Sequence, residues 1–326
     1  MKKLLFLCIM LISSILNAQS ISDTKDKATS TIKAFAMMPP LTVLLEILYP
    51  QGMIGLNYQP YPEDEEFMPE NIANLPVIGM QKGNEPIFEK LIALKPDIIF
   101  FSENTDKKIL DSYRKFGIKA IEVNAFDEAK LSDTIRIYGK ALGVESRADE
   151  LLDFIDTTNA KLATLSTKIT HRPKIYFAQG VDGLATQCGK SDDKSDLAYK
   201  IGGINAIECD KDFANVNFET LSKANPEVIF VREIALYKQL RNAPPKQWQG
   251  ISAIKNKRIY YAPSTPSNWL MKPPSVMQSI GIPFAFAKVH SDILSDEEAR
   301  AIAQGFFARF LRDLSDEDYR RISGEQ

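Results

Sequence analysis

The chain has 326 residues, of which 44% are hydrophobic and 25% charged, so it can bury a sizeable core and is not a disordered or fibrous polypeptide. Its 40 basic residues nearly balance 42 acidic ones, which leaves a net charge of −2 at pH 7. This balance excludes the strongly basic surface that binding to nucleic acid or to an anionic membrane would require. We therefore expect no nucleic-acid partner.

Residues 1–18 predict a secretory signal peptide. Lys2 and Lys3 precede an apolar run from Leu4 to Ile12, which is too short to span a membrane, and Ala18 offers a small residue before the cut. Cys8 lies inside the apolar run and not in a lipid-attachment motif. We expect export by the Sec route, cleavage near Ala18 and a soluble mature protein in the periplasm.

Residues 19–130 predict a first α/β lobe. Helix signals alternate with short apolar runs that are typical of buried parallel strands. Prolines punctuate residues 57–71, for which we expect an irregular loop. The predicted elements are helices at 41–48, 86–94 and 110–116 and strands at 97–101 and 120–123.

One long helix is predicted in the middle of the chain, from Ser146 to Ile169, within a helical linker at residues 131–170. Its apolar positions recur at steps of three and four, which places them on one face. These positions are Ala148, Leu151, Ile155, Thr158, Leu162, Leu165 and Ile169. Ser146 and Asp149 predict a capping box at its start. The helix would span about 35 Å, enough to join two lobes rigidly.

Residues 171–326 predict a second α/β lobe, because the alternation of strand and helix signals restarts after the long helix. The predicted strands are at 174–178, 227–231 and 258–262, and the predicted helices at 194–201, 219–224, 274–289, 296–314 and 316–322. The expected fold is thus α/β, with two lobes joined by a single long helix.

Two segments carry a resemblance to a known family. Residues 89–99 read Glu-Lys-Leu-Ile-Ala-Leu-Lys-Pro-Asp-Ile-Ile, and this pattern returns as Val-Asn-Phe-Glu-Thr-Leu at 216–221 followed by Asn-Pro-Glu-Val-Ile-Phe at 225–230. Further matching blocks lie at 202–205, 248–253 and 258–261. Together they resemble the periplasmic substrate-binding proteins of ABC importers for iron chelates, haem, vitamin B12 and related metal complexes. The resemblance covers essentially the whole mature chain.

The resemblance implies a ligand held in a cleft between two lobes, with little hinge closure. It also implies that a monomer delivers the ligand to a dimeric membrane permease and its ATPase. In that family, glutamates at the positions of Glu89 and Glu219 dock onto permease arginines. The alternative is that both are acids favoured by the dipole at a helix N-terminus.

Candidate ligand contacts follow from the rule that open α/β sheets bind ligands at the carboxyl ends of their strands. This selects Met37, Tyr58, Tyr61, Met80 and Lys82 in the first lobe and Gln179, Arg232, Trp269, Met271 and Lys272 in the second. Apolar and aromatic surface with a few cations suits a bulky, partly anionic chelate. For each residue the alternative is packing in the core or at a rim, and the two tyrosines could also ligate iron directly.

We expect the ligand to be a ferric siderophore or another iron chelate, with haem, a corrinoid or a nickel chelate as alternatives. No intrinsic cofactor or catalytic residue is assigned, because the sequence has no Gly-x-Ser-x-Gly elbow or His-Glu-x-x-His motif. The alternative of a different class is a secreted α/β hydrolase that uses acidic residues in the cleft. Gly183 to Ser191 has one residue too many for a phosphate-binding loop.

Histidine and cysteine complete the candidates. His171 and His290 are the only histidines, and we expect surface or helix-terminal positions for them rather than a dedicated metal site, which needs several converging donors. Any protein ligand to a metal is left unassigned.

Cys188 and Cys209 flank the predicted helix at 194–201, and an oxidising periplasm would allow a disulfide between them. The alternative is a pair of buried free thiols.

Overall fold

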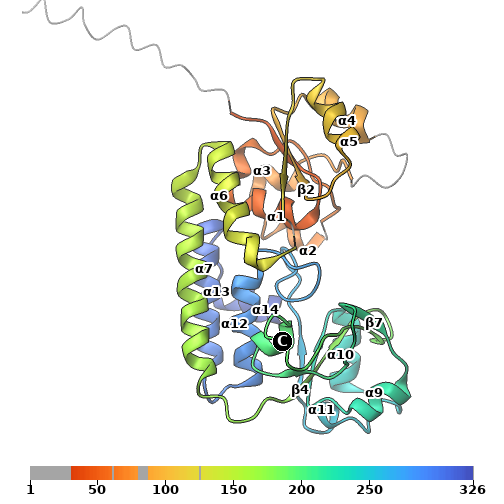
Figure 1. Ribbon diagram of the computed structural model, residues 1–326. Coiled ribbons are helices and arrows are strands. Elements are labelled where there is room, and N and C mark those ends of the chain that lie inside the picture. Colours follow the sequence, from red (N-terminus) through yellow and green to blue (C-terminus); the bar gives the residue numbers. More distant parts are fainter. Residues whose placement is uncertain (1–30, 61, 80–86, 125, 326) are drawn as a thin grey trace, which may run out of the picture. The chain divides into compact units, whose positions relative to one another are not determined.

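The computed structural model describes residues 31–60, 62–79, 87–124 and 126–325. The chain divides into Met1–Thr31 and Ile32–Gln326, and the fold described below is that of the second part (Figure 1). The predicted signal peptide lies outside the described residues. Of the helices in the described part, none combines the length and the apolarity that a membrane crossing requires.

The first lobe is built on a parallel sheet in the order β1-β2-β3, formed by Ala34–Ala36, Ile98–Ser102 and Lys119–Val123. The first two strands are almost wholly buried, as their continuous apolar sequence predicts. Around the sheet lie α1 (Pro39–Leu48), η1 (Pro50–Gly52), α2 (Pro62–Glu65), α3 (Glu70–Ala73), α4 (Ile87–Leu94), α5 (Lys107–Arg114) and η2 (Glu128–Lys130).

The prediction of an irregular loop at 57–71 is partly wrong, because α2 and the first half of its neighbour α3 lie within that segment. Pro62 opens α2, where its missing N–H and fixed φ cost nothing. Three acidic residues in the same turn complement the positive end of the helix dipole. Proline and acidic content here therefore start a helix rather than prevent one.

The predicted long helix is present as α7, which runs unbroken from Glu145 to Ser166, ends three residues before the predicted Ile169 and follows α6 (Leu131–Leu142). Its 22 residues correspond to about 33 Å. The predicted capping box is wrong: the helix begins one residue earlier, with Val144 as N-cap and no side-chain cap. Gly139 allows α6 and α7 to approach closely, because a Cβ there would meet the Ala148 side chain at 2.8 Å.

The second lobe contains a parallel sheet in the order β6-β4-β8-β9, and its strand at Lys174–Ala178 (β4) coincides with the prediction. The other strands of this sheet are Ile204–Asn205 (β6), Val228–Val231 (β8) and Ile259–Tyr261 (β9). Two further strands, β5 (Ala185–Gln187) and β7 (Phe213–Asn215), pair antiparallel and form a separate ribbon. The helices of this region are α8 (Leu197–Lys200), α9 (Phe218–Ala224), α10 (Ile234–Asn242) and α11 (Ser252–Lys255).

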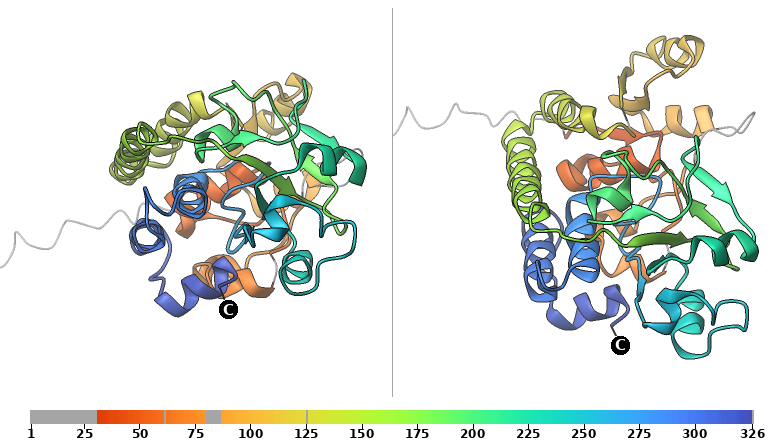
Figure 2. Two further views of the ribbon diagram at one scale, coloured as in Figure 1. Left: turned by 90° about the horizontal axis from the view of Figure 1, so that it is seen from below. Right: turned by 60° about the horizontal axis from the view of Figure 1, so that its bottom comes forward.

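The chain ends with α12 (Gln278–Val289), α13 (Asp296–Phe310) and α14 (Asp316–Ser323). Helix α12 packs against both α7 and α13, and the three run side by side in Figures 1 and 2. Arg321 of α14 then reaches the first lobe, where its two terminal nitrogens lie 2.8 and 2.9 Å from the carboxylate of Glu66. The C-terminal helices therefore contact both the long helix and the first lobe.

One apolar core continues from the first lobe, through α7, to the C-terminal helices. Leu44 of α1, Phe154 of α7 and Phe306 of α13 belong to the same cluster of buried side chains. Two smaller clusters cover the remaining sheet surfaces, one in each lobe. Because the lobes share this packed core, they are joined by more than a flexible connection.

Candidate functional site

Three of the predicted contacts in the second lobe meet where β4 and β8 end. Gln179 follows β4 and Arg232 follows β8, and these strands are parallel neighbours. An Arg232 terminal nitrogen lies 3.3 Å from the side-chain oxygen of Gln179 and 3.2 Å from the main-chain oxygen of Lys272. The network places two cationic residues and an amide at the edge of the sheet where ligands bind in this fold class.

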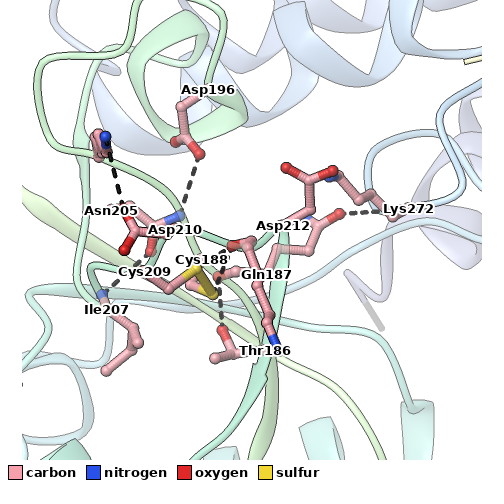
Figure 3. The surroundings of a disulfide bond; sticks show 12 residues. Thr186, Gln187, Cys188, Asp196, Asn205, Ile207, Cys209, Asp210, Asp212 and Lys272 are labelled. Carbon is pink, nitrogen blue, oxygen red and sulfur yellow. Dashed lines mark hydrogen bonds and ion pairs between the residues drawn. A yellow bond between two sulfur atoms is a disulfide. The ribbon is translucent and has the colours of Figure 1, made fainter.

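Two residues that the sequence did not single out hold Lys272 in this network. The main-chain N–H of Lys272 donates to the side-chain oxygen of Gln187 at 2.5 Å. Its ammonium group lies 2.7 Å from a carboxylate oxygen of Asp212 (Figure 3). Gln187 is the last residue of β5, and Asp212 directly precedes β7. The signal that could have found them is their position within three residues of Cys188 and Cys209 in the sequence.

Cys188 and Cys209 form a disulfide, with their Cα atoms 5.6 Å apart (Figure 3). Cys188 directly follows β5, and its N–H donates to the Asp212 carbonyl at 3.4 Å. The loop that leads to Cys209 is ordered by Asn205, whose side-chain oxygen accepts the Ile207 N–H at 3.2 Å. The disulfide thus closes the ribbon at the end that faces Lys272.

The first lobe contributes Tyr58, whose hydroxyl lies 2.8 Å from Oε1 of Glu46 on α1. Burial raises the pKa of Glu46 to about 8, an effect that the hydrogen bond from Tyr58 opposes and the nearby charge of Asp64 reinforces. The pKa of Tyr58 is raised well above its usual range, mainly by burial and secondly by the charge of Glu46. A phenol held in this way is a poor source of the phenolate that direct ligation of iron requires.

The same groups lie at the junction of the two lobes. Hydrogen bonding from Ser267, which belongs to the second lobe, acts on the pKa of Tyr58. The charge of Asp64 on α2 acts on the pKa of Tyr261 on β9, which burial raises. Tyr58 and Asp64 of the first lobe therefore interact with residues of the second lobe that lie on β9 or just after it.

Three predicted contacts are buried and pack in the apolar clusters, as the packing alternative describes, and their role in ligand binding stays a prediction. Trp269 and Met271 have no exposed surface, and Met37 retains only 7%. The Trp269 ring packs among aromatic rings of α12, α13 and α14 and donates its N–H to the Thr265 carbonyl at 2.9 Å. Gly281 permits this, because a Cβ there would overlap the carbonyl of Trp269. The loop after β9 therefore folds inward at Trp269 and Met271, just before it reaches Lys272.

The remaining predicted contacts, Tyr61, Met80 and Lys82, lie outside the described residues. In the part of the chain that the structure describes, no group of three or more histidine, cysteine, aspartate or glutamate side chains could hold a metal ion. His171 is exposed and lies 3.0 Å from Glu227. His290 ends α12 but is buried, with Nε2 2.8 Å from the Gly202 carbonyl.

Two cavities lie away from this network. One of about 220 Å³ is bordered by Tyr261, Lys288 and the C-terminal residues, and the other, of about 400 Å³, lies between α7 and α8. Cationic side chains such as Arg172 and Lys194 line the second cavity near the C-terminal end of α7. The dipole at the C-terminal end of a helix is sufficient to favour cations there, so their presence does not require a bound ligand. Neither cavity is lined by a predicted ligand contact, so the candidate site rests on the polar network.

Residues 57–266 match the family model described as periplasmic binding protein. The match covers most of the chain, including the ends of β4 and β8 that carry the network. The chain belongs to the periplasmic binding protein family. It is therefore a binding protein of an extracytoplasmic family, and the alternative of a secreted hydrolase is wrong.

Individual proteins support this assignment. A solved ABC transporter solute-binding protein from Sulfurospirillum deleyianum DSM 6946 is 27% identical, with a TM-score of 0.78 over 90% of this chain and 94% of that one. The Fe(3+)-citrate-binding protein YfmC of Bacillus subtilis (strain 168) is 23% identical over 69% of this chain and 73% of its own. The substrate-binding lipoprotein YvrC of the same organism, an uncharacterized ABC transporter protein, is 22% identical over 70% and 71%.

The two glutamates expected to dock on a permease are both exposed on short helices of this binding protein. Glu89 lies on α4 in the first lobe, and Glu219 lies in the first turn of α9 in the second. Glu219 pairs with Lys223 one turn later at 2.6 Å, and both side chains are 75% exposed. A pair so exposed contributes about 0 to 1 kcal/mol, so Glu219 stays available to a stronger partner.

Proposed function

We propose that this periplasmic binding protein captures an anionic iron chelate between its lobes and delivers it to an ABC permease. The observation that carries the proposal is the network of Gln179, Arg232 and Lys272 at the ends of β4 and β8. Guanidinium and ammonium groups form short, charge-assisted hydrogen bonds with anionic oxygens. A ligand that enters there meets the guanidinium group of Arg232 and the ammonium group of Lys272, which is paired with Asp212.

The chemistry of the described residues favours a metal that arrives already chelated. The described residues lack a cluster of donors for a bare ion, whereas a chelate is recognised through its outer oxygens and apolar surface. A ferric siderophore or ferric citrate fits this requirement, and one relative is named for binding ferric citrate. Haem, a corrinoid and a nickel chelate are the alternatives.

Titration calorimetry on the mature protein tests the ligand assignment. We expect ferric citrate or a ferric siderophore to bind with one-to-one stoichiometry, more tightly than haemin, cobalamin or a nickel–histidine complex. Protein isolated from its native periplasm should carry iron and the absorbance of a ferric chelate. Tighter binding of haemin or cobalamin than of every ferric chelate would replace the proposed ligand.

The route to the membrane is part of the proposal. Export by the signal peptide at 1–18, with cleavage near Ala18, would bring a monomer into the periplasm. There Glu89 and Glu219, one on each lobe, would meet cationic groups on the two subunits of a permease dimer that an ATPase drives. Paired charges on a rigid body favour fast and oriented association.

A further inference from the structure

The β5–β7 ribbon holds Lys272 at two points, although Gln187 and Lys272 are 85 residues apart in the sequence. The Gln187 oxygen accepts the main-chain N–H of Lys272, and the Asp212 carboxylate pairs with its ammonium group (Figure 3). The main-chain oxygen of Lys272 is in turn bound by Arg232. Both polar groups of the Lys272 backbone are therefore fixed, one by the ribbon and one by the cation beside it.

The disulfide keeps the two halves of the ribbon together at this point. Cys188 is the next residue after Gln187, and Cys209 lies three residues before Asp212. The strands are paired from Gln187 opposite Phe213, and the Cys188 N–H extends the pairing to the Asp212 carbonyl. Gln187 consequently has a fixed position relative to the loop that carries Lys272.

The amide nitrogens of Gln187 and Gln179 are left without a protein acceptor in the described part of the chain. Both side chains are at least 95% buried, and each uses its oxygen for a contact with the network. A buried donor without an acceptor is unfavourable, and an apolar side chain of similar size would avoid that cost. Two such donors next to two cations are explained if ligand oxygens complete their hydrogen bonds.

We propose that Gln187 belongs to the ligand site: with Gln179 it donates to carboxylate oxygens of the chelate, and its own oxygen, held by the disulfide-closed ribbon, positions Lys272. The inference rests on the proposed function and narrows it to chelates that present carboxylates, of the ferric citrate type. A catecholate chelate binds iron through catechol oxygens rather than carboxylates, and haem presents its carboxylates only as two propionates at the edge of a large apolar ring. Gln187 then determines which chelates bind, as well as the position of Lys272.

Calorimetry with ferric citrate tests the role of Gln187. Gln187→Leu keeps the side-chain volume but removes both the donor and the acceptor, so we expect the affinity to fall at least tenfold. Gln187→Glu keeps an acceptor for the Lys272 N–H but replaces the donor with a negative charge, and we expect an equal or larger loss. The control is Gln304→Leu, which makes the same substitution on α13, where the amide contacts Leu314 and Asp316 and not Lys272; the affinity of this variant should stay within twofold of wild type.

A double-mutant cycle separates positioning from general stability. If Gln187 acts through Lys272, then Lys272→Ala should weaken binding less in the Gln187→Leu background than in wild type. The same non-additivity is expected in a Cys188→Ser/Cys209→Ser protein, whose folding is checked by circular dichroism. Full additivity in both backgrounds would overturn the positioning role.

The outcomes also separate this inference from the proposed function. If wild-type protein binds neither ferric citrate nor a ferric siderophore, the proposed function fails. If it binds ferric citrate and Gln187→Leu binds it equally well, only the role of Gln187 fails. If a ferric catecholate binds more tightly than ferric citrate and Gln187→Leu leaves that binding unchanged, the assignment of a carboxylate chelate is overturned while the capture of iron chelates stands.

Discussion

The hydroxyl of Tyr58 lies 2.8 Å from Oε1 of Glu46, so a carboxyl group on α1, in a residue that is only 5% exposed, has a phenolic partner at the junction of the lobes. Burial disfavours the charged form and raises the pKa of Glu46 from 4.5 to about 8. The folded protein therefore keeps this carboxyl protonated at pH values at which the unfolded chain has lost the proton.

The raised pKa of Glu46 predicts a pH-dependent stability. Between about pH 4.5 and 8, unfolding releases the proton, so the free energy of unfolding should fall as pH rises and level off above pH 8. Glu46→Gln cannot ionise, so its stability relative to wild type should increase over this range, by an amount on the order of a few kcal/mol. Urea unfolding of both proteins at pH 5, 6, 7 and 8 measures the difference.

Tyr58→Phe supplies the control for Glu46. The hydrogen bond from Tyr58 lowers the pKa of Glu46, so its removal should shift the pH window of the wild-type protein upward. In the Glu46→Gln background the same substitution should leave the pH dependence unchanged. A wild-type protein and a Glu46→Gln variant with parallel stability curves would show that Glu46 does not titrate in this range.

Replacing Arg232 should lower the affinity for the ligand while the protein still folds. Arg232 is half-buried and donates to Gln179 and to the Lys272 carbonyl, so Arg232→Ala removes a cation and also releases two neighbours. We expect binding of an anionic ferric chelate to weaken by about 1.5 to 3 kcal/mol, the usual value for hydrogen bonds to charged groups. Calorimetry measures this, and Arg114→Ala on the exposed surface of α5 is the control. Equal affinities for both variants would remove Arg232 from the site.

Replacing Trp269 should have the opposite effect, a loss of stability with little change in ligand affinity. Because the Trp269 ring is fully buried among Phe284, Phe307 and Tyr319, Trp269→Ala leaves a large cavity in the core. We expect the free energy of unfolding to fall by about 3 to 5 kcal/mol. The folded variant should bind the ligand within a few-fold of wild type, as measured by chemical denaturation and calorimetry. A large loss of affinity at unchanged stability would return Trp269 to the ligand site.

The contrast between Arg232 and Trp269 shows how far the sequence alone could lead. Strand β4 and helix α7 follow from local apolar patterns, and Gln179 and Arg232 follow from their place after parallel strands. The inward fold of the loop at Trp269 depends on a close approach to Gly281 and on aromatic rings from α13 and α14. No local pattern encodes such contacts.

The same limit explains the two residues that the sequence did not single out. Gln187 reaches Lys272 across 85 residues, and only the pairing of β5 with β7 brings Asp212 to the same place. At the start of α7, the Ser146 motif was present but Val144 became the N-cap, because the turn after α6 sets where the helix begins. Tertiary contacts decided the positions of Gln187 and Asp212, and the preceding turn decided the start of α7.

The continuous core through α7 predicts a small change in dimensions on ligand binding. Leu44, Phe154 and Phe306 belong to one packed cluster, so a large hinge motion would have to break core contacts rather than bend a loop. Small-angle scattering of the mature protein should give nearly the same radius of gyration with and without a saturating ferric chelate. A large decrease on binding would show that the lobes close despite the shared core.

Delivery to a permease gives the last prediction, which concerns Glu89 and Glu219. Both are exposed, and neither contributes to the polar network around Arg232, so reversing their charge should spare ligand binding. If they dock onto cationic groups of a permease dimer, Glu89→Lys with Glu219→Lys should abolish uptake of the radiolabelled ferric chelate while calorimetry shows normal affinity. As helix-terminal acids alone, they would affect stability by only about 0.3 to 1 kcal/mol each.

The matched control for this double variant is Asp153→Lys with Asp156→Lys, which reverses two exposed charges on α7 and changes the net charge equally. If docking is specific to Glu89 and Glu219, this control variant should support normal uptake. A purely long-range effect of net charge would instead reduce uptake by both variants alike. Docking further requires that charge reversal of the permease cations partly restores uptake by the Glu89→Lys/Glu219→Lys protein. If that protein binds the chelate and transports it at the wild-type rate, the two glutamates are not docking residues, and the dipole explanation is sufficient.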